Sequence, residues 1–273
     1  MAFDLTESEF ARLAALVYAK SGLNLHQGKM HLMRARLGKR LRATGCRSFS
    51  EYFELLTVQD DGKELTEMVN AMTTNKTGFF REASHFRFLQ ENLFPKLGPD
   101  SRGRLRLRFW SAGCSTGEEP YSLAISALDY FRGSEHIDAK ILGTDVSTHV
   151  LLEAQRGIYS AAKLRDMPIT LQRRYFQKGF GSLEGQFRVK DPVRRIVMFR
   201  RHNLMESFPQ GITPDAVFCR NVMIYFDKRT QQELIQRFYD ILPPGGHLFL
   251  GHSESLAGHT HSFTYVQPSI YRK

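Results

Sequence analysis

Polar and charged side chains follow each of five apolar segments in the later part of this 273-residue chain. The first segment leads into residues 111–120, which contain two glycines followed by the adjacent carboxylates Glu118 and Glu119. After the other segments come Asp145, Asn203, Leu204, Arg220, Asn221 and His252. Ligands of open parallel sheets bind beyond the carboxyl ends of the strands, so these positions predict one shared binding site.

The chemistry of residues 111–120 favours a ligand without phosphate. This stretch lacks the G-x-G-x-x-G pattern of dinucleotide-binding enzymes and the lysine of a phosphate-binding loop. Its two carboxylates would repel a pyrophosphate, whereas they suit a positively charged nucleoside such as S-adenosylmethionine. In this interpretation Glu118 faces the ammonium group, Gly113 allows close approach and Asp145 binds the ribose hydroxyls. Glycines between a strand and a helix are as often packing devices, so the loop alone leaves both interpretations open.

Alternating strand and helix patterns predict an α/β domain over residues 96–273. Strands are expected at 105–110, 140–143, 195–199, 216–219 and 247–250, and helices at about 119–131, 148–156 and 228–242. This order predicts a mostly parallel sheet, which a pair of strands within 263–271 closes at its edge. Residues of about 176–195 carry three glycines and short alternating runs, which predict a small antiparallel β-subdomain inserted in this domain.

Residues 1–95 predict an all-α N-terminal domain, because apolar positions recur there at three- and four-residue steps. Helix starts are indicated by a capping-box pattern at residues 6–9 and by Ser48, three residues before Glu51. Glycine and proline within residues 97–103 mark a break between the two domains.

The helical domain carries an uneven charge, since residues 11–50 contain nine Lys and Arg residues and no Asp or Glu. A helix over 28–43 would turn an apolar stripe inward and place Lys29, Arg36 and Arg40 on an outer face. That face could meet a glutamate-rich receptor helix. A solvated surface helix or an RNA-binding patch are the alternatives that charge alone leaves open.

The amino-acid composition indicates the kind of protein and the compartment in which it works. With 42% hydrophobic residues the chain can build a sizeable core, and its formal charge of +10 favours an acidic partner. Three widely spaced cysteines form no disulfide framework and match no zinc-ligand spacing, which favours the reducing cytoplasm. No apolar run reaches the ~18 to 20 residues of a membrane span, so we expect no membrane insertion. No metal is expected, and His252 is interpreted as a core histidine.

Four stretches carry a resemblance to a known family: residues 73–82, 110–122, 218–227 and 251–254. In this order they resemble the chemotaxis receptor methyltransferase (CheR) family. The resemblance implies an all-α domain followed by a class I S-adenosylmethionine-dependent methyltransferase domain with a Rossmann-like fold and an inserted β-subdomain. It implies an enzyme that transfers methyl groups to glutamate side chains on the cytoplasmic domain of chemotaxis receptors, in the cytoplasm at membrane receptor arrays.

The resemblance also implies roles for individual residues. Asn75, Thr77 and Arg81 would lie on the segment that closes over the cofactor. Glu118 and Asp145 would bind its methionine and ribose ends, and the rest of the cofactor site would be lined by Asn203, Leu204, Arg220 and Asn221. Arg81, Arg220 and Tyr225 would face the reacting carboxylate. The loop 179–185 of the β-subdomain is compatible with binding a receptor tail peptide.

Two other functions are weighed against this one. A nucleic-acid methyltransferase would show aromatic stacking positions near its target pocket, and none is evident in the sequence. A non-catalytic module that senses S-adenosylmethionine is disfavoured by the intact set of Asn75, Arg81, Asp145, Arg220 and Tyr225. Without the resemblance, Arg81 would be interpreted as a surface charge and Tyr225 as a core aromatic. We expect a monomer that binds no nucleic acid.

Overall fold

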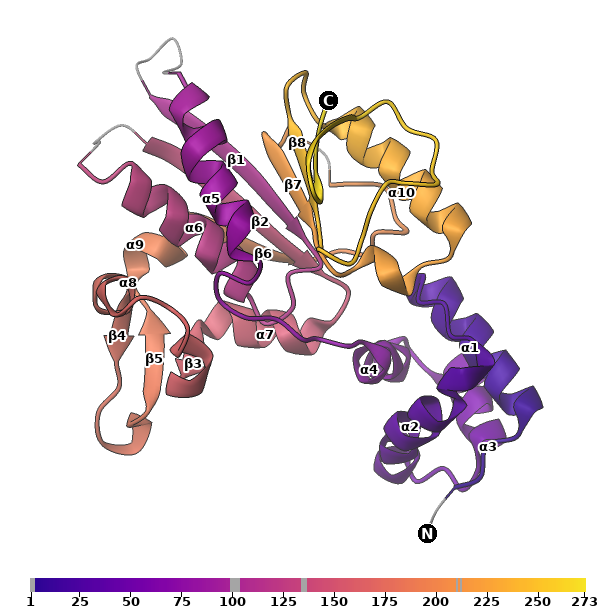
Figure 1. Ribbon diagram of the computed structural model, residues 1–273. Helices are drawn as coiled ribbons and strands as arrows, with labels where there is room; N and C mark the ends of the chain where they lie inside the picture. Colours follow the sequence, from indigo (N-terminus) through magenta and orange to yellow (C-terminus); the bar gives the residue numbers. More distant parts are fainter. Residues whose placement is uncertain (1–2, 99–103, 134–136, 210, 212) are drawn as a thin grey trace.

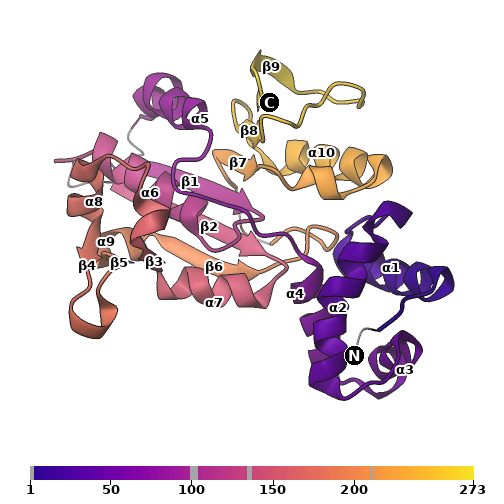
Figure 2. The same cartoon turned by 60° about the horizontal axis from the view of Figure 1, so that its bottom comes forward.

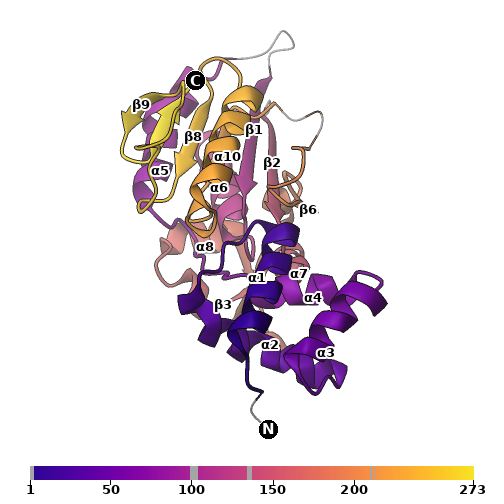
Figure 3. The ribbon, with the colours of Figure 1, turned by 90° about the vertical axis from the view of Figure 1, so that its right-hand side faces the viewer.

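The computed structural model describes residues 3–98, 104–133, 137–209, 211 and 213–273. A helical domain lies at one end of an α/β domain, and the C terminus lies at the opposite end (Figures 1 and 3). The helical domain consists of α1 (Glu7–Ser21), α2 (Met30–Thr44), α3 (Phe49–Glu54) and α4 (Lys63–Met72), with short turns η1 (Gln27–Lys29) and η2 (Leu55–Gln59).

Two helices of this domain begin where the sequence predicts, and α2 lies within two residues of the range expected for it. Thr6 and Glu9 form both hydrogen bonds of a capping box at the start of α1, which ends at Gly22 in the left-handed region. The Ser48 side chain accepts a hydrogen bond from the Glu51 backbone N–H and starts α3. The amphipathic stripe of α2 is buried through Met33, Leu37 and Leu41. These apolar side chains hold the four helices together.

Seven strands form the main sheet of the α/β domain. They are β1 (Leu105–Ala112), β2 (Ile137–Asp145), β6 (Val197–Arg201), β7 (Ala216–Cys219), β8 (His247–Leu250), β9 (Thr264–Gln267) and β10 (Ile270–Arg272). Their order is β6-β2-β1-β7-β8-β10-β9. The first five pair in parallel, whereas β10 is antiparallel to both β8 and β9. The prediction of a mostly parallel sheet closed by an edge pair is confirmed.

Helices cover both faces of this sheet (Figure 2). On one face, α5 (Ala83–Phe88), η3 (Leu89–Leu93), η4 (Phe94–Lys96) and α6 (Glu118–Tyr130) share a core with Phe109. On the other face, α10 (Lys228–Ile241) packs on Trp110. Consecutive strand residues point to opposite faces, so Phe109 and Trp110 belong to different cores. The helix α7 (Thr148–Arg156) lies beside β2 and β6.

The packing of residues 79–94 bears on the expected domain boundary. Phe79, Phe86 and Phe94 belong to the core of the sheet, whereas the helical core ends at Met72. The expected boundary between residues 95 and 96 therefore assigns residues 79–94 to the helical domain, although their side chains pack against the sheet. Most of the break expected at 97–103 lies outside the described residues.

The small second sheet has the order β3-β5-β4 and is antiparallel. Its strands are β3 (Ile158–Ser160), β4 (Phe176–Lys178) and β5 (Gln186–Val189), and its connections contain η5 (Ala161–Leu164), α8 (Ile169–Tyr175) and η6 (Gly181–Leu183). The short helix α9 (Asp191–Arg194) leads from β5 to β6. The expected insertion at about 176–195 contains β4 and β5. The third strand, β3, precedes that range, because the turn after α7 already enters the small sheet.

Candidate functional site

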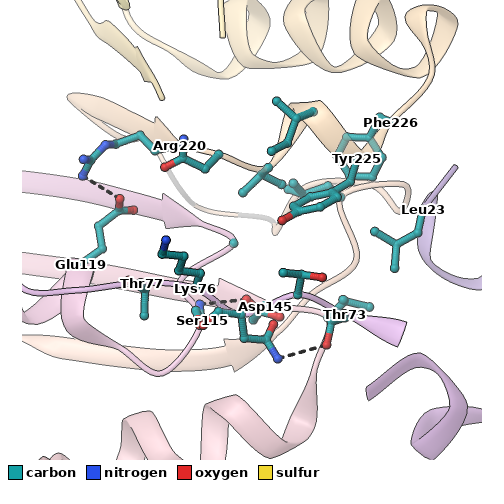
Figure 4. A pocket seen from close by; sticks show the side chains of 18 of the residues that line it. Leu23, Thr73, Lys76, Thr77, Ser115, Glu119, Asp145, Arg220, Tyr225 and Phe226 are labelled. Atoms are coloured by element: carbon teal, nitrogen blue, oxygen red, sulfur yellow. Dashed lines mark hydrogen bonds and ion pairs between the residues drawn. The ribbon is translucent and has the colours of Figure 1, made fainter. Parts of the chain in front are cut away.

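A cavity of about 290 Å³ lies at the carboxyl ends of β1, β2 and β7, next to the helical domain (Figure 4). Most residues predicted for the cofactor or the reacting group line it: Asn75, Thr77, Arg81, Gly113, Asp145, Asn203, Leu204, Arg220, Asn221 and Tyr225. The sheet topology brings together the residues that follow strands, among them Gly113, Asp145 and Asn221, as the strand-end argument requires. Asn75, Thr77 and Arg81, which the family resemblance implied, come from the segment that joins the two domains. The predicted residue Glu118 is not in this lining.

The segment that joins the two domains forms one wall of the cavity. The Ser115 hydroxyl donates to the Asn75 carbonyl at 3.0 Å, and the Arg81 guanidinium donates to the Lys76 carbonyl at 2.9 Å. Further along, Phe80 and Glu82 adopt positive φ angles of 51° and 58°. Such backbone conformations are costly for residues other than glycine and persist only where surrounding contacts hold them. The wall is thus held in a defined shape.

The glycine predicted for close approach is required by the local packing. Gly113 has a φ of 91°, and a Cβ placed there would lie 2.4 Å from a methyl carbon of Val222. The backbone N–H groups of Gly113 and Cys114 both donate to the Thr144 carbonyl at 2.8 Å. A side chain at position 113 would therefore displace the loop that lines the cavity.

Asp145 is placed to bind hydroxyl groups of a ligand. Its carboxylate accepts the backbone N–H groups of Ser115 and Ser147, both at 2.9 Å, which fix its orientation. Burial raises the pKa of this carboxyl above its usual value. A carboxylate has about four acceptor positions, so it can also accept hydrogen bonds from the hydroxyls of a ribose. This donor and acceptor pattern fits the nucleoside part of S-adenosylmethionine.

The ammonium-facing role predicted for Glu118 is not supported by its position. Glu118 is fully buried on the far side of the loop, where it accepts Lys163 Nζ at 2.6 Å and the Thr116 hydroxyl at 2.6 Å. Its neighbour Glu119 lines the cavity instead. The two are consecutive at the start of α6, and neighbouring helical residues point about 100° apart, so only one can face the ligand. The sequence shows two candidate carboxylates but not which one faces inward.

Arg220 is committed to ion pairs within the protein. Its guanidinium pairs with Glu119 at 2.9 Å (Figure 4). It also pairs with Glu82 at 3.0 Å, and its side chain is 2% exposed. It also donates to the Arg81 carbonyl. Arg220 therefore supports the cavity wall, and its guanidinium does not stand free to face a reacting carboxylate as expected.

A buried carboxylate holds the segment that carries Tyr225. Glu254 accepts the backbone N–H groups of Asn221 and Gly251 at 2.7 Å, and that of Ile224 at 3.2 Å. Asn221 itself has a positive φ of 58°. Through these contacts Glu254 fixes the turn after β7 and, with it, the position of the Tyr225 ring at the cavity.

The helical domain completes the cavity through Ser21 and Leu23, which the sequence analysis did not identify. The two domains are joined there, because the Asn24 N–H donates to the Tyr225 carbonyl at 2.8 Å and Asn203 donates to the Lys20 carbonyl at 3.0 Å. The αL glycine at the end of α1 indicates a chain reversal, but no local pattern indicates what packs against it.

The basic face predicted on α2 is only partly available. Arg36 donates to the carbonyls of Met72 and Thr73, both at 2.7 Å, and so holds the end of α4. Arg40 forms an ion pair with Glu64. Of the three residues predicted to meet a receptor helix, Lys29 is exposed as expected, whereas Arg36 and Arg40 are half-buried in internal contacts.

The fold and the cavity define a class of protein: an α/β enzyme that binds a nucleoside at the switch point of a doubly wound sheet, as S-adenosylmethionine-dependent methyltransferases do. Comparison with known families agrees. Residues 75–272 match the CheR methyltransferase SAM binding domain, and residues 8–73 match the CheR methyltransferase all-alpha domain. The chain therefore belongs to the CheR methyltransferase family, and S-adenosylmethionine is its methyl donor.

Curated relatives match over nearly the full chain. The chemotaxis protein methyltransferase of Borreliella burgdorferi is 37% identical over 99% of this chain and 95% of its own length. That of Salmonella typhimurium is 39% identical over 98% of this chain and 90% of its own. That of Escherichia coli is 38% identical over 98% and 91%. The resemblance drawn from four short stretches is confirmed. Within the described part of the chain, no helix is long and apolar enough to cross a membrane.

Proposed function

We propose that this chemotaxis protein methyltransferase transfers the methyl group of S-adenosylmethionine to glutamate side chains on the cytoplasmic helices of chemotaxis receptors. The observation that carries the proposal is the cavity between the two domains. It joins the wall segment containing Arg81, the buried Asp145 and the aromatic Tyr225 at the end of the sheet. Such a cavity holds a donor on one side and is open to a side chain of a second protein on the other.

The donor supplies an activated methyl group on a sulfonium, and an ionised carboxylate can accept it directly. Glutamate titrates near pH ~4.3, so no residue of this chain needs to act as a general base. The protein must instead align the reacting atoms, which contributes up to ~7 to 11 kcal/mol in the best intramolecular cases. Arg81 and Tyr225 suit this role, since a guanidinium and a hydroxyl can orient a carboxylate while one oxygen stays free.

The remaining cavity residues hold the donor in this proposal. Asp145 takes the ribose hydroxyls, and Glu119 replaces Glu118 as the carboxylate nearest the ammonium group. Asn75, Thr77, Asn203, Leu204 and Asn221 line the rest, while Gly113 keeps the loop close. Arg220 acts indirectly, because it fixes Glu119 and the backbone of Arg81.

The reaction is tested with labelled S-adenosylmethionine and cytoplasmic receptor fragments. We expect alkali-labile label on receptor glutamates, which identifies carboxyl methyl esters. A receptor fragment with its glutamates changed to alanine serves as the control and should stay unlabelled. Label that appears only on added RNA, or base-stable label on the receptor, would overturn the proposal.

The receptor helix is proposed to approach the helical domain through its exposed cations. Lys29, Lys39 and Arg42 are exposed, and the domain has no acidic residue between 11 and 50. A glutamate-rich helix would be steered to this surface by long-range attraction that salt screens. Association rates measured at increasing ionic strength should fall steeply, and a rate independent of salt would count against this surface.

The small β-subdomain is proposed to bind the receptor's tail peptide. Two of its apolar side chains are unusually exposed, Phe180 at 79% and Leu183 at 50%, and both follow the edge strand β4. Gly179 keeps their turn tight, since a Cβ there would lie 2.2 Å from the Leu183 carbonyl oxygen. An extended peptide can add to such an edge as a further strand, and its apolar side chains can then pack against Phe180 and Leu183.

A peptide-binding measurement tests whether the exposed apolar side chains of the β-subdomain bind the receptor tail. A fluorescent receptor tail peptide should bind the protein with modest affinity, and Phe180→Ser should weaken it. The matched control is Ile169→Ser, which changes a side chain that is 57% exposed on α8. Equal affinities for the two variants would remove the tail from the proposal.

We also propose that the enzyme is a cytoplasmic monomer recruited to membrane receptor arrays. Sedimentation of the purified protein should give the mass of one chain. A fluorescent fusion should collect at receptor clusters and disperse through the cytoplasm when receptors are deleted.

A further inference from the structure

Three potential metal ligands meet beside the cavity. Glu82 and His85 lie at the start of α5, and His252 follows β8, about 170 residues later in the sequence. Their ligand atoms all lie within 4.8 Å of one another. None of the three lines the donor cavity as described. The sequence predicted no metal because these ligands have no recognisable spacing, and only the packing of α5 against the sheet brings them together.

His85 is the unusual member of this group. Its side chain is 0% exposed, and neither ring nitrogen has a hydrogen-bond partner among the described residues. A buried polar group without a partner is destabilising, so it calls for a functional explanation. Its Nδ1 lies 3.7 Å from Glu82 Oε2.

His252 supplies the open side of the group. It is exposed, its ring centroid lies 5.1 Å from that of His85, and its Nε2 lies 3.0 Å from the Ser84 hydroxyl. Its backbone N–H donates to Glu82 Oε1 at 3.1 Å, which fixes the carboxylate beside it. An ion from solvent would therefore reach the buried nitrogen past the exposed His252 side chain, which exchanges its contact with Ser84 for the ion.

We propose that Glu82, His85 and His252 form a binding site for Zn²⁺. Two imidazole nitrogens and one carboxylate oxygen are a common zinc donor set, with water in the fourth position. Zinc bonds of ~2.0 to 2.2 Å require the ligand atoms to approach one another further. The exposed His252 ring makes this movement by turning from Ser84 toward His85.

Occupancy of this site acts on the methyl-transfer cavity through Arg220. The Glu82 oxygen nearest His85, Oε2, also accepts Arg220 at 3.0 Å. A zinc ion would take this oxygen and place two positive charges near the guanidinium. Arg220 then keeps only Glu119 as a carboxylate partner, and the wall that it supports shifts. Zinc is thus an inhibitor of methyl transfer that binds outside the donor cavity.

Metal binding is tested on the untagged full-length enzyme by titration with Zn²⁺ against a chromophoric chelator and with Co²⁺ by visible absorption. We expect one site per chain with the absorption of a tetrahedral or five-coordinate cobalt ion. His252→Ala should weaken it at least about tenfold, since each ligand contributes substantially to affinity. The matched control is His149→Ala, which removes another exposed histidine beside a carboxylate, 2.8 Å from Glu67, without a third ligand among the residues that the structure describes.

The outcomes separate the proposal from incidental histidine binding. Equal weakening by both variants, or no loss in His252→Ala, would overturn it. Because a change at the buried His85 could unfold the protein, Glu82→Gln serves as the second variant, with its fold checked by circular dichroism, and should also lose the site. Added zinc should slow methyl transfer by the wild type, with recovery on chelation, but not by His252→Ala. Equal slowing of both would refute the link to Arg220.

Discussion

Both domains contain arginines that the sequence places at a binding surface but that the structure places in internal contacts. In the helical domain, Arg36 and Arg40 come from a strongly basic stretch, yet they turn inward to bind carbonyls and Glu64. In the sheet domain, Arg220 was expected to face a ligand, yet it is buried between Glu82 and Glu119. The Arg81 guanidinium, in contrast, lies at the cavity and donates to one backbone carbonyl, that of Lys76.

The comparison shows that an arginine's role depends on which acceptors the fold brings near it. Arg40 and Arg220 form ion pairs with carboxylates that are distant in sequence. Arg81 and Lys29 remain available to bind other molecules. Charge patterns therefore describe the electric field of a domain better than they identify contact residues. Three predictions test this division between supporting and available cations, and one compares a buried histidine with an exposed one.

The largest effect is expected for Arg220→Ala. It leaves Glu82 and Glu119 buried without their shared cation, and removing one partner of a buried pair costs about 3–5 kcal/mol of unfolding free energy. Chemical denaturation with urea measures the change. A loss no larger than that of an exposed ion pair, about 0–1 kcal/mol, would show that Arg220 is not a supporting residue.

The next effect is on the reaction rather than on stability. Arg81→Ala should lower turnover about 100-fold, as expected when the reacting groups lose alignment, while donor affinity changes far less. Single-turnover methylation and donor titration measure the two quantities. An equal loss in both would assign Arg81 to donor binding alone, and an unfolded variant would place it with Arg220 among the supporting residues.

The pH dependence of stability should differ between a histidine in the sheet and one on the surface of the helical domain. Burial, followed by repulsion from Arg272 and Lys96, lowers the pKa of His247 on β8 to about 4. The unfolded chain takes up this proton near pH ~6.5, so stability is present above that pH and is lost as the pH falls toward 4. His247→Phe should flatten this slope, which totals about 3 kcal/mol. His31→Ala, at an exposed position of α2, should leave the slope unchanged.

The smallest effects divide the cations of α2. Arg40→Ala should cost about 1–2 kcal/mol of stability, because its pair with Glu64 is half-buried, and should leave receptor association unchanged. Combined alanine changes at Lys39 and Arg42 should have the reverse result, with slower association at low salt and stability within about 0.5 kcal/mol of the wild type. Slower association of Arg40→Ala by a similar factor would restore it to the receptor surface.

The sequence predicted the parallel sheet and the part of the cavity at the strand ends because both follow from local rules. The other predicted cavity residues, Arg81 and Tyr225 among them, were implied by the family resemblance. Strand ends in a parallel sheet meet at one edge, which placed Gly113, Asp145 and Asn221 together without any knowledge of long-range contacts. The choice between Glu118 and Glu119 failed because helix phase at an N-terminus depends on how α6 docks on the sheet.

Contacts between distant segments were the part that could not be predicted. Ser21 and Leu23 reach the cavity only because Gly22 fits closely against Met205 and Phe226, where a Cβ would lie within 2.8 Å of both side chains. The group of Glu82, His85 and His252 likewise depends on the docking of α5. Neither arrangement leaves a periodic or motif signal in the chain.

Because both domains line the cavity, a bound donor would also hold the helical domain against the sheet domain. If the helical domain swings away from the sheet, Ser21 and Leu23 leave the wall and the donor loses part of its enclosure. By thermodynamic reciprocity, a bound donor must then draw the two domains together by the same free energy that closure adds to its affinity. An enzyme loaded with donor would thus present its basic helices and its reacting centre to a receptor as one rigid surface.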